Sequence, residues 1–368
     1  MKHKITAISF LVVIFGVFFL SVFKETDEFS SSERRRLAQF PELTTESVLD
    51  GEFMKDFNDF AVDQAALREE FRRVKAFFDL NILRKLDNNG IFVYNDMVFK
   101  TDYPLDEQSV LRLCGIINAV RDLYLDDSNN VWYTFLPDKN MFISDSGYLV
   151  LDYDEMQSLI HNALGDMAYI GIAGELSLNS YFCTDPHWRQ EVLLPVAEKL
   201  AAGMNAELNL KSFTEERFDE FYGAYYGQSA LNMPPDELIW LVSELTSRAV
   251  VHNLEHPGMR FPVYDTSKFR AVDPYSLFLC GSAAIVTVQN PANNTDRELI
   301  IFRDSFASPL TPLLLGAYDK ITLIDLRYIN PAAVGQYADF NGADVLFMYS
   351  AGLFNSSESV RGVSAADT

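Results

Sequence analysis

Two short segments of the sequence contain residue types that could together catalyse acyl transfer. Asp185 and His187 stand two positions apart in TDPHW, and Ser305 follows an apolar run in IIFRDSF. In an extended turn, residues i and i+2 point the same way, so the carboxylate could accept from Nδ1–H and leave Nε2 as a base. Ser305 falls between a predicted strand and a possible helix start, where backbone N–H groups can stabilise an oxyanion. These residues predict a Ser-His-Asp site, which occurs in any chain order.

Each of these residues also has an ordinary structural explanation. Asp185 could cap a helix whose first turn contains His187, and Ser305 could be a turn serine that caps the next helix. Ser308, which precedes Pro309, could supply that second cap equally well. In that case Ser305 would have no structural role, which favours the catalytic interpretation.

A metal site is a weaker possibility. His252 and His256 are four residues apart, a spacing that could hold a metal on a helix. Pro257 and Gly258 would end any helix there, and no third ligand is evident in the sequence. We therefore expect an ordinary loop at this position, and neither a metal nor a cofactor in the protein.

The three cysteines, Cys114, Cys183 and Cys280, are scattered along the chain. Such spacing predicts neither a disulfide framework nor a metal centre, although one bridge plus a free thiol stays open. Cys183 lies two residues before Asp185 and could be a nucleophile, but its neighbours Tyr181 and Phe182 indicate a buried thiol.

The elements that must position these residues alternate between helices and strands. Helical spacing of apolar residues predicts helices over 53–74 (with a break near residue 63 as an alternative), 107–125, 155–167 and 187–204. Apolar runs predict strands over 131–137, 168–173, 283–289, 298–302, 320–328 and 343–350, and 90–100 reads as a β-hairpin. The alternation predicts an α/β fold, with a mostly parallel sheet covered by helices on both faces.

The segment from Ile5 to Phe23 is almost entirely apolar and long enough to cross a hydrocarbon core. Lys2 and Lys4 precede it, and only Lys24 follows it closely, so the positive-inside rule places the main domain outside the cytoplasm. A cleaved signal peptide would have a shorter apolar region and a small-residue cleavage site. We therefore expect an uncleaved single-pass signal-anchor, with a cleaved, secreted form as the alternative.

Charge and composition exclude several classes of function. The chain has 368 residues, with 52 Asp and Glu against 30 Lys and Arg, a net charge of −22. This balance argues against a nucleic-acid binder and against adhesion to an anionic membrane through a basic patch. Aromatic residues make up 13%, which is not typical of a disordered chain. The predicted organisation is an anchor (1–24), a stalk and helical lead-in (25–80), one α/β domain (81–356) and a disordered tail (357–368).

These motifs, in this order, resemble the DHHW family of bacterial exported proteins and the wider AlgX/AlgJ-like group of SGNH hydrolases. TDPHW precedes FRDSF, and both follow an N-terminal anchor. The segments SERRRLAQFPELT, DGEFMKDFNDFAVDQAALREEF, NGIFV, FLPDK and FYGAYYGQSA are also similar, so the resemblance runs from about Ser31 to Asn355. One departure is Pro186, at the second position of the Asp-His-His-Trp motif that names the family.

The resemblance implies an SGNH-like three-layer α/β/α sandwich, and the related alginate proteins are O-acetyltransferases that act on extracellular polysaccharide. By this likeness Ser305 would be the acyl nucleophile, His187 the general base and Asp185 its orienting partner. The oxyanion donor could be the backbone N–H of Ser305 or the side chain of Arg327, which could instead pair with Asp325 or Asp304.

The predicted function is that of a membrane-anchored, extracytoplasmic O-acetyltransferase or acetylesterase that acts on a cell-envelope or extracellular polysaccharide. Because no acetyl-CoA exists outside the cell, a transferase would need a multi-spanning membrane protein as acyl donor. Trp188, Tyr222, Tyr225 and Tyr226 could stack on sugar rings, although aromatic residues are more often core. The alternative is a non-catalytic glycan-binding or envelope-assembly protein that retains the fold.

Overall fold

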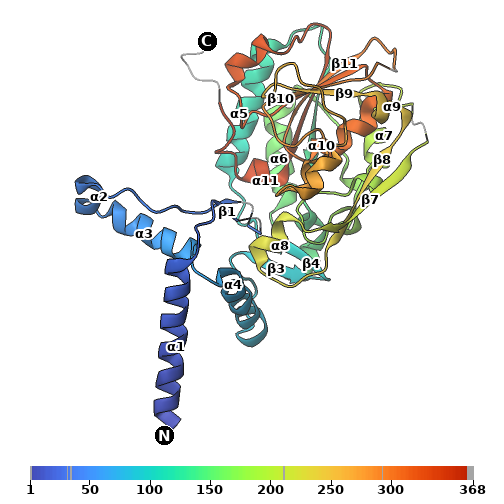
Figure 1. Ribbon diagram of the computed structural model, residues 1–368. Helices are drawn as coiled ribbons and strands as arrows, with labels where there is room; N and C mark the ends of the chain where they lie inside the picture. The colour runs from blue at the N-terminus through green and yellow to red at the C-terminus, as the bar shows by residue number, and fades with distance from the viewer. Residues whose placement is uncertain (1, 31, 34, 210–211, 292, 363–368) are drawn as a thin grey trace. The chain divides into compact units, whose positions relative to one another are not determined.

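The computed structural model describes residues 2–30, 32–33, 35–209, 212–291 and 293–362 (Figure 1). The chain divides into two compact units. The first contains residues 1–98 and 224–234, and the second contains residues 99–223 and 235–368. This division differs from the predicted boundaries at 80 and 356, because the first unit extends to residue 98 and regains a short segment from the middle of the chain.

A seven-stranded sheet forms the centre of the second unit, in the order β6-β5-β13-β11-β12-β10-β9. The strands are β5 (Val131–Leu136), β6 (Ala168–Tyr169), β9 (Val250–Asn253), β10 (Ile285–Gln289), β11 (Glu298–Arg303), β12 (Lys320–Ile324) and β13 (Asp344–Ser350). The first five strands in the order are parallel, and β10 runs antiparallel to both of its neighbours. The predicted α/β fold with a mostly parallel sheet is confirmed.

Helices cover both faces of this sheet, as expected for strands that are apolar along their whole length. On one face lie α5 (Glu107–Tyr124), α6 (Tyr153–Leu164) and α11 (Ala351–Asn355), and on the other lie α7 (Leu194–Gly203) and α10 (Ala307–Leu310) (Figure 1). Phe302 of β11 stacks on Phe347 of β13, with ring centroids 4.8 Å apart, in the core beneath α5 and α6. The result is the predicted three-layer arrangement.

Capping residues fix where the two long helices begin. The side chain of Asp106 accepts from the backbone N–H of Ser109 at the start of α5, and Asp152 does the same for Glu155 at the start of α6. Because parallel strands and the helices between them run in opposite directions, both helices begin at the edge where the strands end. This edge is where open α/β sheets bind ligands.

The predicted helix over 187–204 is wrong in its first half. The α-helix begins only at Leu194, because the preceding backbone groups bond across a loop instead of along a helix. Tyr181 and Trp188 form an antiparallel bridge, and the backbone N–H of Arg189 donates to the carbonyl of Ser180. Asp185 is therefore not a helix cap, and His187 is not a first-turn residue.

Two other segments also differ from the prediction. The mixed region 213–245 contains a hairpin of β7 (Thr214–Phe221) and β8 (Asp236–Val242), followed by the short helix α9 (Glu244–Arg248). Of the predicted tail, residues 357–362 include the buried Ser357 and Val360, whose carbonyls accept from the guanidinium of Arg112. Residues 363–368 lie outside the described residues.

The first unit begins with α1 (Lys2–Phe23), and it also contains most of the predicted hairpin and several short elements. Within the described residues, one helix, His3–Phe23 with a mean hydropathy of 2.7, is long and apolar enough to cross a membrane. A membrane anchor and a signal sequence share this length and composition. The other elements are β1 (Phe29–Ser30), β2 (Arg35–Arg36), α2 (Thr45–Leu49), α3 (Glu52–Asp63), α4 (Arg68–Phe77), the π-helix η1 (Phe78–Ile82), β3 (Ile91–Tyr94), β4 (Met97–Lys100) and α8 (Ala224–Ser229).

Candidate active site

Ser305 lies in the turn that follows β11, at the carboxyl edge of the sheet. Its neighbour Asp304 is buried and holds this turn in place: one carboxylate oxygen accepts from the backbone N–H of Phe306 at 3.1 Å, and the other accepts from that of Ser350 at 2.8 Å. Since Ser350 ends the adjacent strand β13, the turn is tied to two strands of the sheet. Ser305 remains partly accessible at this edge.

The loop that carries Asp185 and His187 is held by one buried cation and one carboxylate. The ammonium of Lys139, which is 1% exposed, donates to the carbonyls of Phe182 at 3.1 Å, Cys183 at 3.3 Å and Asp185 at 3.1 Å. Backbone N–H groups of the same loop, at positions 183 and 184, donate to the carboxylate of Asp236 at 2.7 and 2.8 Å. The loop conformation is therefore fixed through both its carbonyls and its N–H groups.

These two segments bring Asp185, His187 and Ser305 into contact. His187 Nδ1 lies 2.5 Å from Asp185 Oδ1, and His187 Nε2 lies 2.7 Å from Ser305 Oγ, although 118 positions separate the last two residues. Asp185 is fully buried, and the His187 side chain is 15% exposed. Because an ionised carboxylate only accepts, Nδ1 carries the proton and Nε2 is free to accept from the serine hydroxyl.

Aromatic rings hold the imidazole in this orientation. The ring of Tyr275 stacks on His187 with centroids 4.1 Å apart and an angle of 15°, and Phe306 packs at 4.9 Å. Burial, with a further contribution from the Asp185 charge, raises the pKa of Tyr275 well above its usual value, so its ring stays neutral. Tyr275 was not predicted from the sequence, since it lies in an irregular segment with no motif around it.

Arg327 forms the ion pair with Asp325 that the sequence left open. Its Nε donates to Asp325 Oδ1 at 2.9 Å and its Nη2 to Oδ2 at 2.6 Å. Two hydrogen bonds to a buried carboxylate raise the pKa of this guanidinium above its usual value, despite the opposing effect of burial. These two donors are engaged with Asp325, which does not favour Arg327 as an oxyanion donor.

The predicted sugar-stacking residues do not share one environment. Trp188 is completely buried and donates from Nε1 to the carbonyl of Phe306 at 2.9 Å, so its ring supports the turn and cannot contact a sugar. Tyr222 is 42% exposed in the second unit. Tyr225 and Tyr226 lie in α8, which belongs to the first unit, and their role stays a prediction.

A buried polar region below the turn was also not predicted. Arg303, the last residue of β11, is 1% exposed, and its Nη1 lies 3.4 Å from the Asp304 carbonyl and 3.8 Å from Asp325 Oδ2. Among the described residues, its Nε and Nη2 have no hydrogen-bond partner, and neither do the hydroxyls of Tyr275 and Tyr349. Buried polar groups of this kind are normally satisfied by water or by a ligand.

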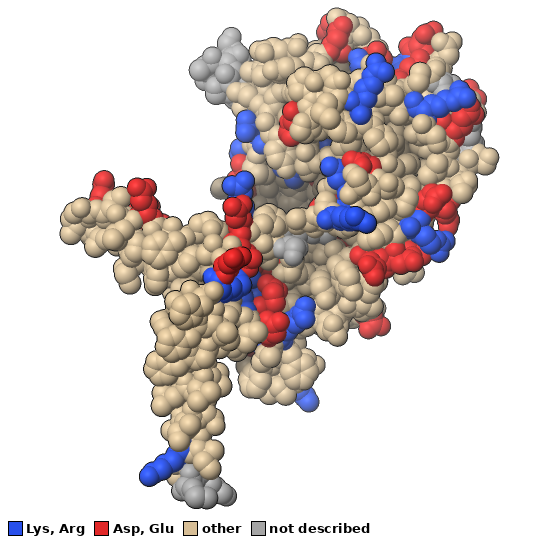
Figure 2. Space-filling model, viewed as in Figure 1, with Lys and Arg blue, Asp and Glu red and all other residues tan. Residues whose placement is uncertain are grey.

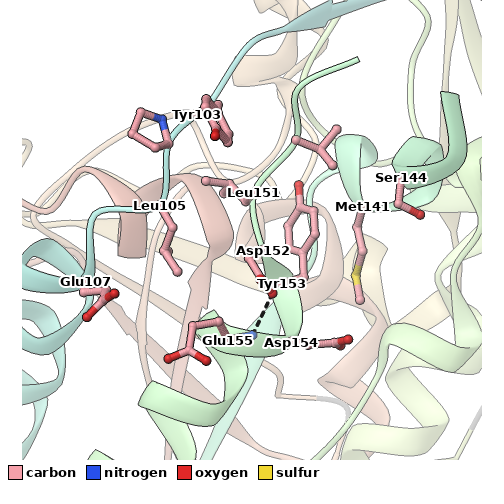
Figure 3. Close-up of a pocket in the computed structure, with 12 residues that line it drawn as sticks. Tyr103, Leu105, Glu107, Met141, Ser144, Leu151, Asp152, Tyr153, Asp154 and Glu155 are labelled. Atoms are coloured by element: carbon pink, nitrogen blue, oxygen red, sulfur yellow. Dashed lines mark hydrogen bonds between the residues drawn. The ribbon is translucent and has the colours of Figure 1, made fainter. Parts of the chain in front are cut away.

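A cavity of about 720 Å³ opens where α5 and α6 begin, and Figure 3 shows its lining. Tyr103, Leu105, Met141 and Tyr153 supply apolar surface, and its acidic residues are Glu107, Asp152, Asp154 and Glu155. The acidic residues lie at or next to helix N-termini, where negative charge is stabilising. No lysine or arginine is among the residues that line this cavity.

The remaining sequence candidates gain no support. All three cysteines are free thiols, and burial raises the pKa of Cys183, which opposes a thiolate nucleophile. His252 lies in β9 and His256 in the turn after it. Within the described ranges, no group of three or more His, Cys, Asp or Glu side chains could hold a metal ion.

Comparison with solved structures finds the same α/β fold in other proteins. A DHHW family protein from Eubacterium siraeum has a TM-score of 0.57 at 17% identity and covers 76% of this chain and 97% of its own. Bacillus cereus PatB1, solved with a sulfonyl adduct, has a TM-score of 0.57 at 16% identity and covers 72% of this chain and 96% of its own. The O-acetyltransferase domain of Pseudomonas putida AlgJ has a lower TM-score of 0.45 at 11% identity and covers 76% of this chain and 96% of its own.

The sequence comparison points to one family. The model of the family described as DHHW protein matches residues 156–324, a segment that contains Asp185, His187 and Ser305. The predicted resemblance to the DHHW family is therefore confirmed over this segment. Comparison with curated proteins found no match.

Proposed function

We propose that this protein is an SGNH-type O-acyltransferase that moves acetyl groups onto, or off, the hydroxyls of a polysaccharide outside the cytoplasm. The observation that carries this proposal is the contact of Ser305 Oγ with His187 Nε2 at 2.7 Å, with Asp185 Oδ1 on the other ring nitrogen at 2.5 Å. A serine, an imidazole and an orienting carboxylate in this arrangement are the parts that nucleophilic acyl transfer needs.

The first half-reaction would form an acetyl-enzyme. Ser305 Oγ attacks the carbonyl carbon of an acetyl ester while His187 Nε2 takes the hydroxyl proton, and Asp185 stabilises the imidazolium that forms. When the tetrahedral intermediate collapses, the bond to the leaving oxygen breaks, and His187 returns the proton to that oxygen. The donor alcohol leaves, and the acetyl group remains as an ester on Ser305.

The second half-reaction would regenerate the serine. A sugar hydroxyl gives up its proton to His187 and attacks the acetyl carbon, and Ser305 leaves with the proton that His187 returns. Water in place of the sugar would make the enzyme an esterase, so the same residues would catalyse both acetyl transfer and hydrolysis.

Two groups are candidates for oxyanion stabilisation. The backbone N–H of Ser305 is located at the turn, as the sequence suggested. The buried guanidinium of Arg303 supplies positive charge directly next to this turn, and two of its nitrogens have no partner among the described residues. A preorganised positive charge near the reacting oxygen would stabilise the intermediate.

The acidic cavity next to α5 and α6, whose lining does not include Asp185, His187 or Ser305, is a separate surface that suits a neutral or amino-bearing glycan. Carboxylates in its lining would repel a strongly anionic polymer. The N-terminal apolar helix supports an extracytoplasmic location, with α1 as the anchor. A transferase there would need an acyl donor that delivers its group through the membrane.

The test is hydrolysis of an acetyl ester by the full chain and by Ser305→Ala and His187→Ala. Each substitution should lower kcat/KM by at least about 10³-fold, because nucleophile and base act as one unit. Ser308→Ala, three residues along the same segment, is the matched control and should retain activity. Equal activity in all four proteins would refute the mechanism, and a wild-type protein without activity that still binds glycan would favour a binding protein that retains the fold.

A further inference from the structure

Helix α4 has its polar and apolar sides reversed relative to an ordinary surface helix. Two of its large apolar residues form one stripe with the residues that flank the helix, at intervals of three and four positions, and each member of the stripe is strongly exposed. The stripe consists of Leu67 (51% exposed), Phe71 (49%), Val74 (65%) and Phe78 (50%). Four large apolar side chains in one exposed row form a patch that soluble proteins avoid.

The polar side of the same helix is engaged inside the unit. Arg68 donates to Glu33 at 2.5 Å, and Arg72 donates to the carbonyl of Gly227 at 2.8 Å. Glu33 also forms an ion pair with Arg72 at 3.3 Å, and its side chain is 17% exposed. Arg68 and Arg72 therefore hold α4 against its own unit, and this attachment leaves the stripe facing outward.

A second exposed apolar group lies on α3. Phe40 packs on Phe53, Phe57 and Phe60 with centroid distances of 6.4, 5.9 and 5.3 Å, yet it is 62% exposed, and Met54 on the same helix is 63% exposed. The visible surfaces of helices α1, α2 and α3 carry few charges (Figure 2). Charged side chains gather instead near the end of α1.

Direct hydrogen bonds connect both groups to the outer end of α1. Ser21 Oγ accepts from the backbone N–H of Ala66, which precedes the stripe by one residue, at 2.9 Å. The side chain of Gln64, at the end of α3, bonds both the N–H and the carbonyl of Asp27 at 2.9 and 2.8 Å. Ser21 lies two residues before the end of α1, so α3 and α4 meet at the level where this helix would leave the membrane.

We propose that the apolar stripe of α4 and the Phe40–α3 group lie in the interfacial layer of the lipid bilayer that α1 crosses. Lipid is the occupant that the observations favour, because both groups are continuous with the end of an apolar helix that is itself uncovered. An amphipathic helix of this type lies parallel to the surface with its apolar side among the acyl chains. The proposal requires that α1 is a retained membrane anchor, and it is independent of the acyl-transfer chemistry.

Tryptophan fluorescence tests the proposal in the full chain, reconstituted into phosphatidylcholine vesicles. Phe71→Trp places a reporter on the stripe, and Arg73→Trp is the matched control, because two residues along a helix rotate a side chain to nearly the opposite side. The native tryptophans Trp132, Trp188 and Trp240 are buried in the second unit, and the unmodified protein measures their contribution. Lipid brominated near the ester end of its acyl chains should quench Phe71→Trp about twofold and leave Arg73→Trp unquenched, because interfacial helices lie shallow.

Each other outcome contradicts the proposal. Emission from Phe71→Trp that is unquenched and as red as that of Arg73→Trp would mean that the stripe faces water. Unquenched but blue-shifted emission would mean that protein, such as a second copy of this chain, covers it. Quenching only by lipid brominated near the methyl end would place the helix inside the hydrocarbon core. Phe78→Trp, further along the stripe, repeats the measurement in case the first variant fails to fold.

Discussion

The two compact units distribute polar and apolar side chains in opposite ways. In the second unit an apolar core encloses few charged groups, and several of these position His187 and Ser305. In the first unit the buried groups include Asp63 and Asp79, whereas large apolar side chains of α3 and α4 face outward. The contrast teaches that burial alone does not reveal the role of a residue: a buried charge serves the candidate site in one unit and attaches helices in the other.

The largest effect is expected from Asp185→Asn in the second unit. The amide would leave no carboxylate to fix the His187 tautomer or stabilise the imidazolium, so kcat on an acetyl ester should fall about 10²–10⁴-fold. KM should change little, because the substitution acts on the base and not on substrate binding. Asp127→Asn, an exposed carboxylate in the same unit, is the control. Equal kcat for both variants would mean that this buried charge has only a structural role.

Matched phenylalanine truncations test the contrast in apolar residues. Phe302→Ala, in the core between β13 and the covering helices, should lower the free energy of unfolding of the second unit by about 3–5 kcal/mol. Phe71→Ala on the exposed stripe of α4 should change stability in the absence of lipid by no more than about 0.5 kcal/mol. Native-state hydrogen exchange at the amides of β11 and α4 measures each effect locally. Comparable losses at the two sites would contradict the contrast.

The buried charges of the first unit can be tested through Asp63. Its carboxylate accepts from Arg35 at 2.5 and 2.7 Å and from the backbone N–H of Ala38 at 2.9 Å. Asp63→Asn should weaken hydrogen-exchange protection of α3 and α4 by about 1–3 kcal/mol, because the donors lose a charged acceptor. Protection of the second-unit strands should not change. An unchanged exchange rate in α3 would show that this pairing contributes nothing to the unit.

The same carboxylate predicts an acid response. Hydrogen bonding to Arg35 is the main reason that the pKa of Asp63 is lowered from 3.8 to about 2. Because the pKa in the folded state lies below the pKa in the unfolded state, this carboxylate stabilises the first unit fully above about pH 4. The stabilisation is lost as the pH falls through about 2. Hydrogen exchange of α3 across this window should show the loss in the parent protein and not in Asp63→Asn.

The smallest effect is expected from titration of Lys139. Burial lowers the pKa of its ammonium from 10.5 to about 8, against the opposing charges of Asp185, Asp236, Cys183 and Asp138. Above this pH the neutral amine offers only two N–H donors to three loop carbonyls, so activity should fall severalfold as pH rises through 8. Stability should rise over the same range, because the unfolded state binds more protons between about 8 and 10.5. Lys139→Met should lack this alkaline decline, and a parent profile that stays flat would contradict the assignment.

The sequence predicted the residues of the candidate site better than their surroundings. Asp185, His187 and Ser305 could be found because a two-residue spacing and an apolar strand before a polar turn are local patterns. Lys139 follows a buried strand in FLPDK, and that position was a usable signal, but its three carbonyl contacts depend on how distant loops meet. Tyr275 gave no signal, because stacking on an imidazole leaves no pattern in the sequence.

The fold was predicted where strands are apolar and was missed where they are not. Continuous apolar runs identified β5, β11 and β13, whereas β7 is mostly exposed and charged, so neither alternation nor an apolar run marked it. The helix expected from His187 failed because hydrogen bonds across a loop replaced helical ones, an outcome that tertiary contacts decide. The reversed polarity of α4 was also missed, because periodicity locates an apolar stripe but not the side on which it is covered.

The edges of the main sheet have a consequence for the behaviour of the protein at high concentration. At one edge β6 is only two residues long, and at the other Val251 of β9 exchanges both backbone hydrogen bonds with Phe261. Long, unpaired edge strands are templates for adding strands from other molecules. With one edge short and the other partly closed by its own chain, the second unit is poorly suited to strand-to-strand aggregation, an advantage for a domain that would refold outside the cytoplasm.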